Sequence, residues 1–170
     1  MRIELGSCAV RDWRLDDREP LARLADNPRI AANLRDAFPS PYALADADRF
    51  LAMATGRDPR AHWAIEVDGA AAGGIGIMPH TDVERLTAEI GYWLGEPYWG
   101  RGVVTAALRA VTEHALAAFG LTRIFAVPFA TNAASHRVLE KAGYVLEGVM
   151  RRSAIKHGEI VDQRLYAYVR

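Results

Sequence analysis

Two glycines, Gly100 and Gly102, lie immediately before the longest helix that the sequence predicts, residues 103–119. Glycine adopts backbone conformations that other residues avoid, and it lets a ligand approach the main chain closely. The start of a helix adds unpaired N–H groups and the positive end of its dipole, which together favour a phosphate or pyrophosphate group. The run Trp99-Gly100-Arg101-Gly102-Val103-Val104-Thr105 is therefore either an anion-binding loop or an ordinary tight turn.

Two other nucleotide-binding patterns are excluded. No G-x-x-x-x-G-K-[ST] motif occurs, so the chain has no P-loop. A second glycine-rich run, residues 73–76, lies inside a predicted strand with no helix after it, which indicates close backbone packing or a bulge. No acidic ribose-binding residue follows a proper glycine fingerprint, which argues against a nucleotide-dependent dehydrogenase.

The amino-acid composition excludes several functional classes of protein. The 170 residues include 21 basic and 21 acidic side chains, so the chain lacks the overall field of a general nucleic-acid binder. No stretch approaches the roughly 20 apolar residues of a membrane span, and the N-terminus does not resemble a signal peptide. The single cysteine and the histidines show no metal-ligand spacing. We therefore expect a cytoplasmic protein without metal, nucleic-acid or membrane partners.

Strand and helix patterns alternate along the chain, which predicts one mixed α/β domain over residues 1–170. The sheet should be mostly antiparallel, with about seven strands and about four helices around it. The expected strands are residues 9–15, 62–67, 71–78, 86–94, 122–129, 144–150 and 160–169, and the expected helices are 16–25, 46–55, 103–119 and 132–141. Residues 30–42 contain two prolines and predict a long loop or a broken helix.

Four short motifs in this order resemble the GNAT acetyltransferases, and most closely their ribosomal-protein N-terminal (Rim-type) branch. They are Ala88-Glu89-Ile90-Gly91-Tyr92-Trp93-Leu94, Tyr98-Trp99-Gly100-Arg101-Gly102, Asn132-Ala133-Ala134-Ser135 and Leu139-Glu140-Lys141-Ala142-Gly143-Tyr144. The order of elements matches that fold over nearly the whole chain.

The resemblance implies acetyl-CoA as cosubstrate, bound where the fourth and fifth expected strands splay apart. Trp99 and Val104 depart from the family's usual residues in the pyrophosphate loop, where the contacts are mostly made by the backbone. The positions that the resemblance assigns to cofactor binding are Trp93, Leu94, Gly100, Arg101, Gly102, Val103, Val104, Thr105, Asn132 and Ser135. Arg101, Arg137 and Lys141 are candidates for the CoA phosphates.

Two side chains are the catalytic candidates. Glu89 lies in a strand beside the expected gap, and it is either a general base for the acceptor ammonium or an ion-paired strand residue. A backbone N–H near Trp93 or Leu94 is a candidate to hold the developing oxyanion. Ser135 matches a serine that donates a proton to the leaving thiolate, or else it supports the cap of its helix. Many relatives carry a tyrosine where this chain has Leu139, and a phenol there should reach a similar place.

The expected activity is direct transfer of an acetyl group from acetyl-CoA to a primary amine, foremost the α-amine of a protein or peptide N-terminus. The alternatives are acetylation of a small amine, such as an antibiotic or polyamine, and a non-catalytic acyl-CoA-binding module. Residues 33–42 and the last hairpin should wall the acceptor pocket. Basic residues of that hairpin either guide an acidic partner or form a solvated turn. We expect a monomer or a homodimer.

Overall fold

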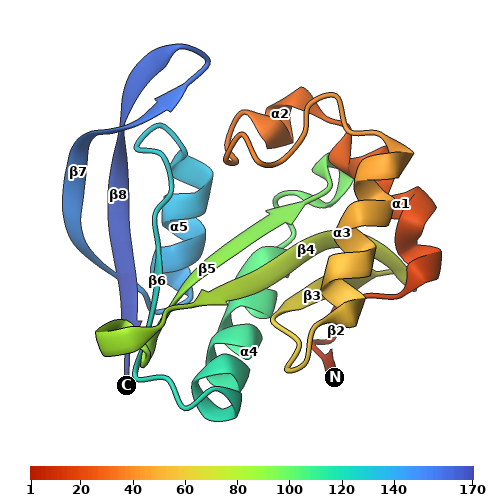
Figure 1. The fold of residues 1–170 in the computed structure, drawn as a ribbon, viewed down its shortest axis with the longest axis horizontal. Helices are drawn as coiled ribbons and strands as arrows, with labels where there is room; N and C mark the ends of the chain where they lie inside the picture. Colours follow the sequence, from red (N-terminus) through yellow and green to blue (C-terminus); the bar gives the residue numbers. More distant parts are fainter.

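The computed structural model describes all 170 residues, and its centre is one open sheet of eight strands in the order β1-β2-β3-β4-β5-β6-β8-β7 (Figure 1). All neighbouring pairs are antiparallel except β5 and β6, which are parallel. The strands are β1 (Arg2–Glu4), β2 (Ala9–Asp12), β3 (His62–Val67), β4 (Ala70–Pro79), β5 (Thr87–Leu94), β6 (Arg123–Ala126), β7 (Val145–Lys156) and β8 (Glu159–Val169).

Five α-helices accompany the sheet: α1 (Arg18–Ala25), α2 (Pro28–Ala31), α3 (Leu44–Gly56), α4 (Val103–Ala118) and α5 (Ala133–Lys141). Short 3-10 turns occupy Leu15–Asp17, Asp82–Glu84 and Glu96–Tyr98. The predicted mixed, mostly antiparallel α/β fold is confirmed, with one more strand and one more helix than expected. The extra strand, β1, has only three residues and pairs along the edge of β2, so it leaves little trace in the hydrophobic pattern.

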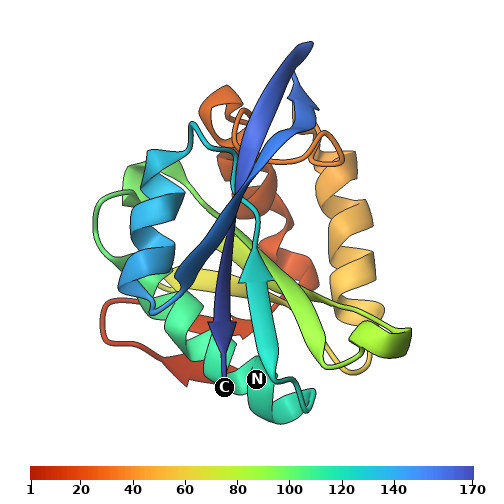
Figure 2. The same cartoon turned by 90° about the vertical axis from the view of Figure 1, so that its left-hand side faces the viewer.

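The helices cover both faces of the sheet (Figure 2). On one face, α1 and α3 pack over a small core that includes Trp13, Leu21 and Leu51. On the other face, α4 packs over the larger core, and its residues Ala107, Leu108 and Val111 are fully buried. The helical repeat of apolar residues over 103–118 thus becomes one buried stripe, as the periodicity predicts. None of the helices has the length and apolar content that a membrane crossing requires.

The parallel pair β5–β6 is the feature that opens the sheet. It is joined over only three residue pairs, from Thr87 with Arg123 to Glu89 with Phe125. Beyond Glu89 the two strands diverge, which Figure 1 shows clearly, and the rest of β5 has no partner on that side. The splay between the fourth and fifth expected strands is therefore confirmed.

The predicted strand over residues 122–129 was too long, because β6 ends at Ala126. Pro128 follows two residues later and has no N–H with which to continue a ladder. Phe129 makes only an isolated bridge to Gln163. The early end of β6 leaves the start of α5 at the side of the gap.

Two boundaries near the N-terminus also differ from expectation. The predicted strand over residues 9–15 ends at Asp12, and a 3-10 turn over Leu15–Asp17 leads into α1. The long segment over residues 30–42 is a loop after the single turn of α2, as its prolines suggest. The last two strands are longer than expected and form one hairpin around His157 and Gly158.

Candidate active site

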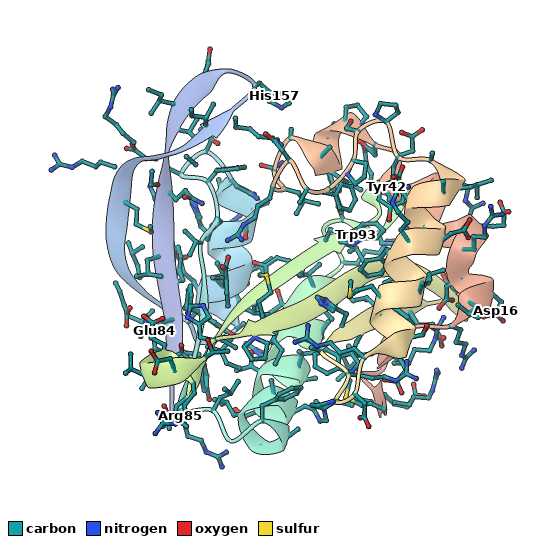
Figure 3. All side chains as sticks on the ribbon, viewed as in Figure 1. Asp16, Tyr42, Glu84, Arg85, Trp93 and His157 are labelled. Atoms are coloured by element: carbon teal, nitrogen blue, oxygen red, sulfur yellow. The ribbon has the colours of Figure 1, made fainter.

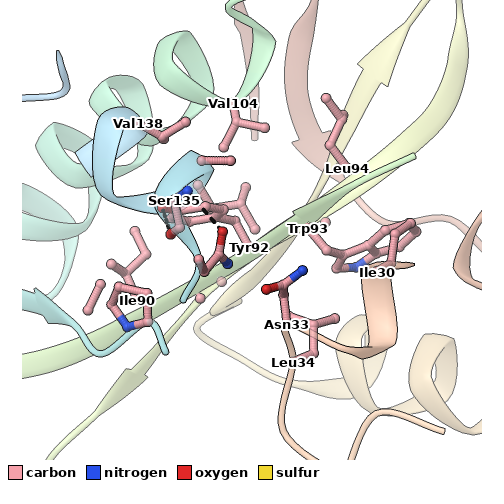
Figure 4. A pocket seen from close by; sticks show the side chains of 18 of the residues that line it. Ile30, Asn33, Leu34, Ile90, Tyr92, Trp93, Leu94, Val104, Ser135 and Val138 are labelled. Carbon is pink, nitrogen blue, oxygen red and sulfur yellow. Dashed lines mark hydrogen bonds between the residues drawn. The ribbon is translucent and has the colours of Figure 1, made fainter. Parts of the chain in front are cut away.

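A cavity of about 790 Å³ occupies the gap between β5 and β6 (Figure 4). Its walls come from the α2–α3 segment, strands β3 to β5, the loop before α4, and α5. It is lined by residues of both faces of β5, so it passes around the free edge of that strand. Every site residue that the sequence predicted lies in its lining: Glu89, Trp93, Leu94, Gly100, Arg101, Gly102, Val103, Val104, Thr105, Asn132 and Ser135.

The glycine loop presents its backbone to this cavity. Gly100 and Gly102 both have a φ of +76°, a left-handed conformation that favours glycine, and Gly102 directly precedes α4. No atom lies within 4 Å of the place where a Cβ would stand at either glycine. The indole of Trp99 donates a hydrogen bond of 2.7 Å to the Leu94 carbonyl, which ties the loop to the end of β5. The loop therefore has the exposed N–H groups and the helix dipole that an anion requires.

Three cationic side chains line the same end of the cavity: Arg101, Arg137 and Lys141. None of the three forms a salt bridge with a carboxylate of the chain. The Arg101 guanidinium lies over the Tyr98 ring, 5.5 Å from its centroid. This end of the cavity suits a polyanionic group.

Ser135 is positioned by the start of α5. The Asn132 side chain caps this helix, because its Oδ1 accepts a hydrogen bond of 3.1 Å from the Ser135 N–H. The capping role belongs to Asn132, and the Ser135 hydroxyl is used elsewhere. Its Oγ lies 2.7 Å from the phenol oxygen of Tyr92, across the gap between α5 and β5 (Figure 4).

Tyr92 is the site residue that sequence reasoning missed. Alternation along the strand places it with Ile90 and Leu94 on the core side, and its ring does pack against that core. Its hydroxyl nevertheless reaches the cavity. Burial raises the pKa of this phenol to about 12, although the hydrogen bond with Ser135 acts in the opposite direction. The only sequence signal was a tyrosine, with one polar end, in a strand beside the expected gap.

The expectation for a phenol at position 139 stays a prediction. Leu139 has no exposed surface and belongs to the main core, so a larger phenol side chain there would have to displace core side chains. Ser135 and Leu139 are four positions apart and therefore lie near one face of α5. That face is wide enough for one residue to point to the core and the other to the cavity. In this chain a phenol beside Ser135 comes from β5.

Glu89 stands at the last paired position of β5, where the strand leaves β6. Its side chain is 16% exposed, and its Oε1 accepts a hydrogen bond of 2.5 Å from the Arg35 guanidinium. Arg35 lies on the loop after α2 and is 63% exposed. An ion pair was one of the two roles that the sequence allowed for Glu89. It is present, and its partner Arg35 faces solvent.

The loop after α2 and the tip of the last hairpin contact each other. Of these two segments, which were expected to wall the acceptor pocket, the loop lines the cavity between Asn33 and Phe38, and the hairpin contributes only Gln163. The Lys156 ammonium donates to the Leu34 carbonyl at 2.8 Å and to the Asp36 carboxylate at 2.7 Å. Trp93 lies beneath this loop (Figure 3), where its ring packs against Phe38 at a centroid distance of 5.9 Å. Trp93 is therefore a cavity residue, whereas Trp13 and Trp63 are buried in the cores.

No group of three or more His, Cys, Asp or Glu side chains is arranged to hold a metal ion. The arrangement combines one carboxylate, one pair of hydroxyl groups and the glycine loop around a single cavity. These groups can move protons and bind a polyphosphate.

Curated proteins with similar sequences include a ribosomal-protein-serine acetyltransferase of Escherichia coli strain K12. It is 33% identical over 97 residues, which cover 56% of this chain and 54% of the relative. An uncharacterized N-acetyltransferase, YoaA of Bacillus subtilis, is 37% identical over 83 residues, covering 49% and 47%. The matched segments thus span about half the length of these relatives.

Solved structures match over the whole chain. RimJ of Mycobacterium smegmatis, in complex with a CoA disulfide, has a TM-score of 0.85 and 26% identity, and the match covers 99% of this chain and 84% of RimJ. RimL, a ribosomal L7/L12 alpha-N-protein acetyltransferase in complex with coenzyme A, has a TM-score of 0.88 and 20% identity, with coverage of 99% and 98%, and it supports the fold alone.

A family model described as the acetyltransferase (GNAT) domain matches residues 9–145. The matches above confirm the resemblance to the Rim-type branch. The chain belongs to the GNAT acetyltransferase domain family.

Proposed function

We propose that this chain is an N-acetyltransferase that transfers the acetyl group of acetyl-CoA directly to the α-amine of a peptide or protein N-terminus. The observation that carries the proposal is the cavity around the free edge of β5. It joins Glu89 on one face of the strand to the Tyr92–Ser135 pair on the other, and the glycine loop lies at the same end as the pair. A reaction at the strand edge would have a base on one side and a proton donor on the other.

The residues of this cavity fit a CoA molecule. The backbone N–H groups at the start of α4 would hold the pyrophosphate, and Arg101, Arg137 and Lys141 are the candidates to face the remaining 3′-phosphate. The β5 backbone beyond Glu89, unpaired on the β6 side, offers N–H and C=O groups to an extended amide chain. Acetyl-CoA supplies an activated thioester, which an unprotonated amine attacks.

Glu89 would accept the proton of the acceptor ammonium at its carboxylate, directly or through water. The Arg35 guanidinium now holds this carboxylate, so the acceptor has to take its place. The exchange is inexpensive, because exposed ion pairs contribute only about 0–1 kcal/mol. The ammonium of the acceptor would then replace the Arg35 guanidinium at Glu89.

Ser135 would donate its hydroxyl proton to the leaving sulfur and would take a proton back from water. Tyr92 would fix that hydroxyl by donating its own proton to the serine oxygen, which leaves the serine hydrogen free to point into the cavity. With a pKa of about 12, the phenol keeps its proton at neutral pH. Tyr92 therefore acts through Ser135, as a positioning residue.

The choice of a protein or peptide acceptor is supported by the relatives. The Escherichia coli relative is named for a ribosomal-protein serine, and the name of RimL specifies α-N acetylation of a protein. Five residues of the Asn33–Phe38 loop line the cavity, and an acceptor chain would contact them.

The test is thiol release from acetyl-CoA with a panel of acceptors. We expect release with peptides that have a free N-terminus and none with the same peptides blocked at that amine. Release with antibiotic amines or polyamines alone would assign a small-molecule acceptor instead. Mass spectrometry of the peptide product would place the acetyl group at the α-amine or on a lysine.

A non-catalytic acyl-CoA-binding module is the second candidate, and the Arg35–Glu89 ion pair favours it, since the guanidinium already occupies the carboxylate that would have to meet the acceptor amine. This reading predicts tight acetyl-CoA binding by calorimetry without thiol release for any amine in the panel. Turnover with any acceptor would exclude it.

A further inference from the structure

Next to Glu89, on the same face of the sheet, there is a position without a side chain, Gly91. Gly91 faces the same side as Glu89 and Trp93, because alternate residues of a strand share a face. Across the sheet it pairs with Gly76 of β4, and Gly76 pairs with His62 of β3. Two neighbouring strands thus carry no side chain in this row.

Only one of these glycines is open. A Cβ on Gly76 would collide with the His62 ring, and a Cβ on Gly74 would lie 2.8 Å from the indole nitrogen of Trp93. At Gly91 no atom lies within 4 Å of that position. The His62 and Trp93 rings therefore flank an empty slot whose floor is Gly91, and all three residues line the cavity.

The slot is uncharged apart from its end at Glu89. Burial lowers the pKa of His62, and the nearby charge of Arg57 lowers it further, so the ring is neutral at pH 7. Phe50 of α3 packs beside His62 with its ring centroid 6.2 Å away, and it lines the same cavity. A charged group placed among these rings would lose its water, and Arg57, whose charge acts on His62, does not line the cavity.

We propose that the slot over Gly91 holds the substituent next to the acceptor amine, and that this substituent is uncharged. This inference rests on the proposed function, because it places the amine at Glu89. The neutral His62 ring has one N–H donor and one acceptor nitrogen, so a hydroxyl or amide fits the slot as well as a hydrocarbon does. For a peptide acceptor, the first residue therefore has an uncharged side chain.

A carboxylate in the slot gains nothing from Arg35. Once the acceptor amine takes its place at Glu89, the exposed Arg35 side chain turns into solvent, and an acidic substituent at this end of the slot faces the Glu89 carboxylate. A basic substituent would compete with the acceptor's own ammonium for Glu89. Both kinds of charge are thus disfavoured, for different reasons.

The experiment compares five peptides that differ only in the first residue, which is Gly, Ser, Met, Asp or Lys. We expect kcat/KM for the Ser and Met peptides to exceed that for the Asp and Lys peptides by at least about tenfold, a difference of about 1.4 kcal/mol. Equal values for charged and uncharged peptides would overturn the inference.

A Gly91→Val variant tests the place of the slot. The new side chain would fill it, so the ratio of kcat/KM for the Met peptide to that for the Gly peptide should fall about tenfold relative to wild type. Gly148→Val is the matched control, because Gly148 is also a strand glycine with open space around it, but it lies outside the cavity. An unchanged ratio in Gly91→Val would also overturn the inference.

A parallel panel of small amines separates this inference from the proposed function. If no peptide is acetylated, the N-terminal acceptor is wrong, and the slot is judged by comparing 2-phenylethylamine and ethanolamine with β-alanine and putrescine. Preference for the uncharged pair would support the slot. Preference for the charged pair, or no turnover with any amine, would overturn it.

Discussion

Two strand carboxylates, Glu66 on β3 and Glu89 on β5, are both bonded to arginines, but their surroundings differ. Glu66 accepts hydrogen bonds from Arg11 and, at 2.9 Å, from Arg2. Arg11 is 3% exposed, lies on the neighbouring strand β2, and is also held by Asp17 through two bonds of 2.7 Å. Glu89 has one partner, Arg35, on an exposed loop.

This difference separates a structural ion pair from an exchangeable one. Arg2 and Arg11 hold the pKa of Glu66 down at about 2, and removing Glu66 would take a charge-assisted hydrogen bond from the buried Arg11 guanidinium, which would cost stability. Arg35 can turn into water without such a penalty. The burial of the partner, more than the presence of an ion pair, decides which carboxylate is free to do chemistry.

The largest expected effect is on stability. Glu66→Gln should lower the free energy of unfolding by about 1.5–3 kcal/mol, because the buried Arg11 loses one of its two carboxylate partners. Glu89→Gln should lower it by less than about 1 kcal/mol, as for an exposed pair. Urea unfolding of the two variants measures both, and equal losses would remove the distinction.

Acidic pH should reduce the difference in stability between the wild type and Glu66→Gln. The pKa of Glu66 is lowered from 4.5 to about 2 on folding, so its ionised form stabilises the native state above about pH 4.5. This contribution, about 3 kcal/mol, should disappear as the pH falls through 2. Unfolding curves of wild type and Glu66→Gln should therefore converge between pH 4.5 and 2, and a constant gap would contradict the assignment.

A smaller effect concerns the hydroxyl pair. Ser135→Ala should lower kcat about tenfold while the Kd for acetyl-CoA stays within a few-fold, because a thiol of pKa about 8.5 leaves slowly unaided. Tyr92→Phe should lower kcat about threefold. The double variant should be no slower than Ser135→Ala alone, since Tyr92 acts through the serine. Additive losses in this double-mutant cycle would mean that the phenol acts independently.

The smallest effect is expected at the exchangeable partner. Arg35→Ala should change the free energy of unfolding by no more than about 0.5 kcal/mol. It should lower the KM for the acceptor by a few-fold, because the ammonium no longer displaces a guanidinium from Glu89. A raised KM would show instead that Arg35 binds the acceptor.

Local sequence patterns predicted much of the fold. The strands expected over residues 62–67 and 71–78 and the helix expected over residues 103–119 follow from local patterns, and all three are present, the two strands as the pair β3–β4 and the helix as Val103–Ala118. The splay of β5 from β6 came from the family resemblance.

The contacts within the site were harder to predict. Arg35 and Glu89 are separated by 54 positions, and Tyr92 and Ser135 by 43, so no local pattern links either pair. The open space over Gly91 depends on where the His62 and Trp93 rings lie, and those positions are set by packing between strands. Sequence patterns assign faces, whereas tertiary packing decides which side chains meet.

The pH dependence of acetyl transfer by Glu89→Gln tests the central claim most directly. Rates of thiol release with a free-N-terminus peptide would be measured for wild type and variant from pH 6 to 9, with the acetyl-CoA Kd of each as a control. If Glu89 takes the ammonium proton, the variant should be slower by about 10²-fold at pH 7 and should recover as the free amine becomes abundant. Superimposable pH–rate profiles at equal acetyl-CoA affinity would contradict the account.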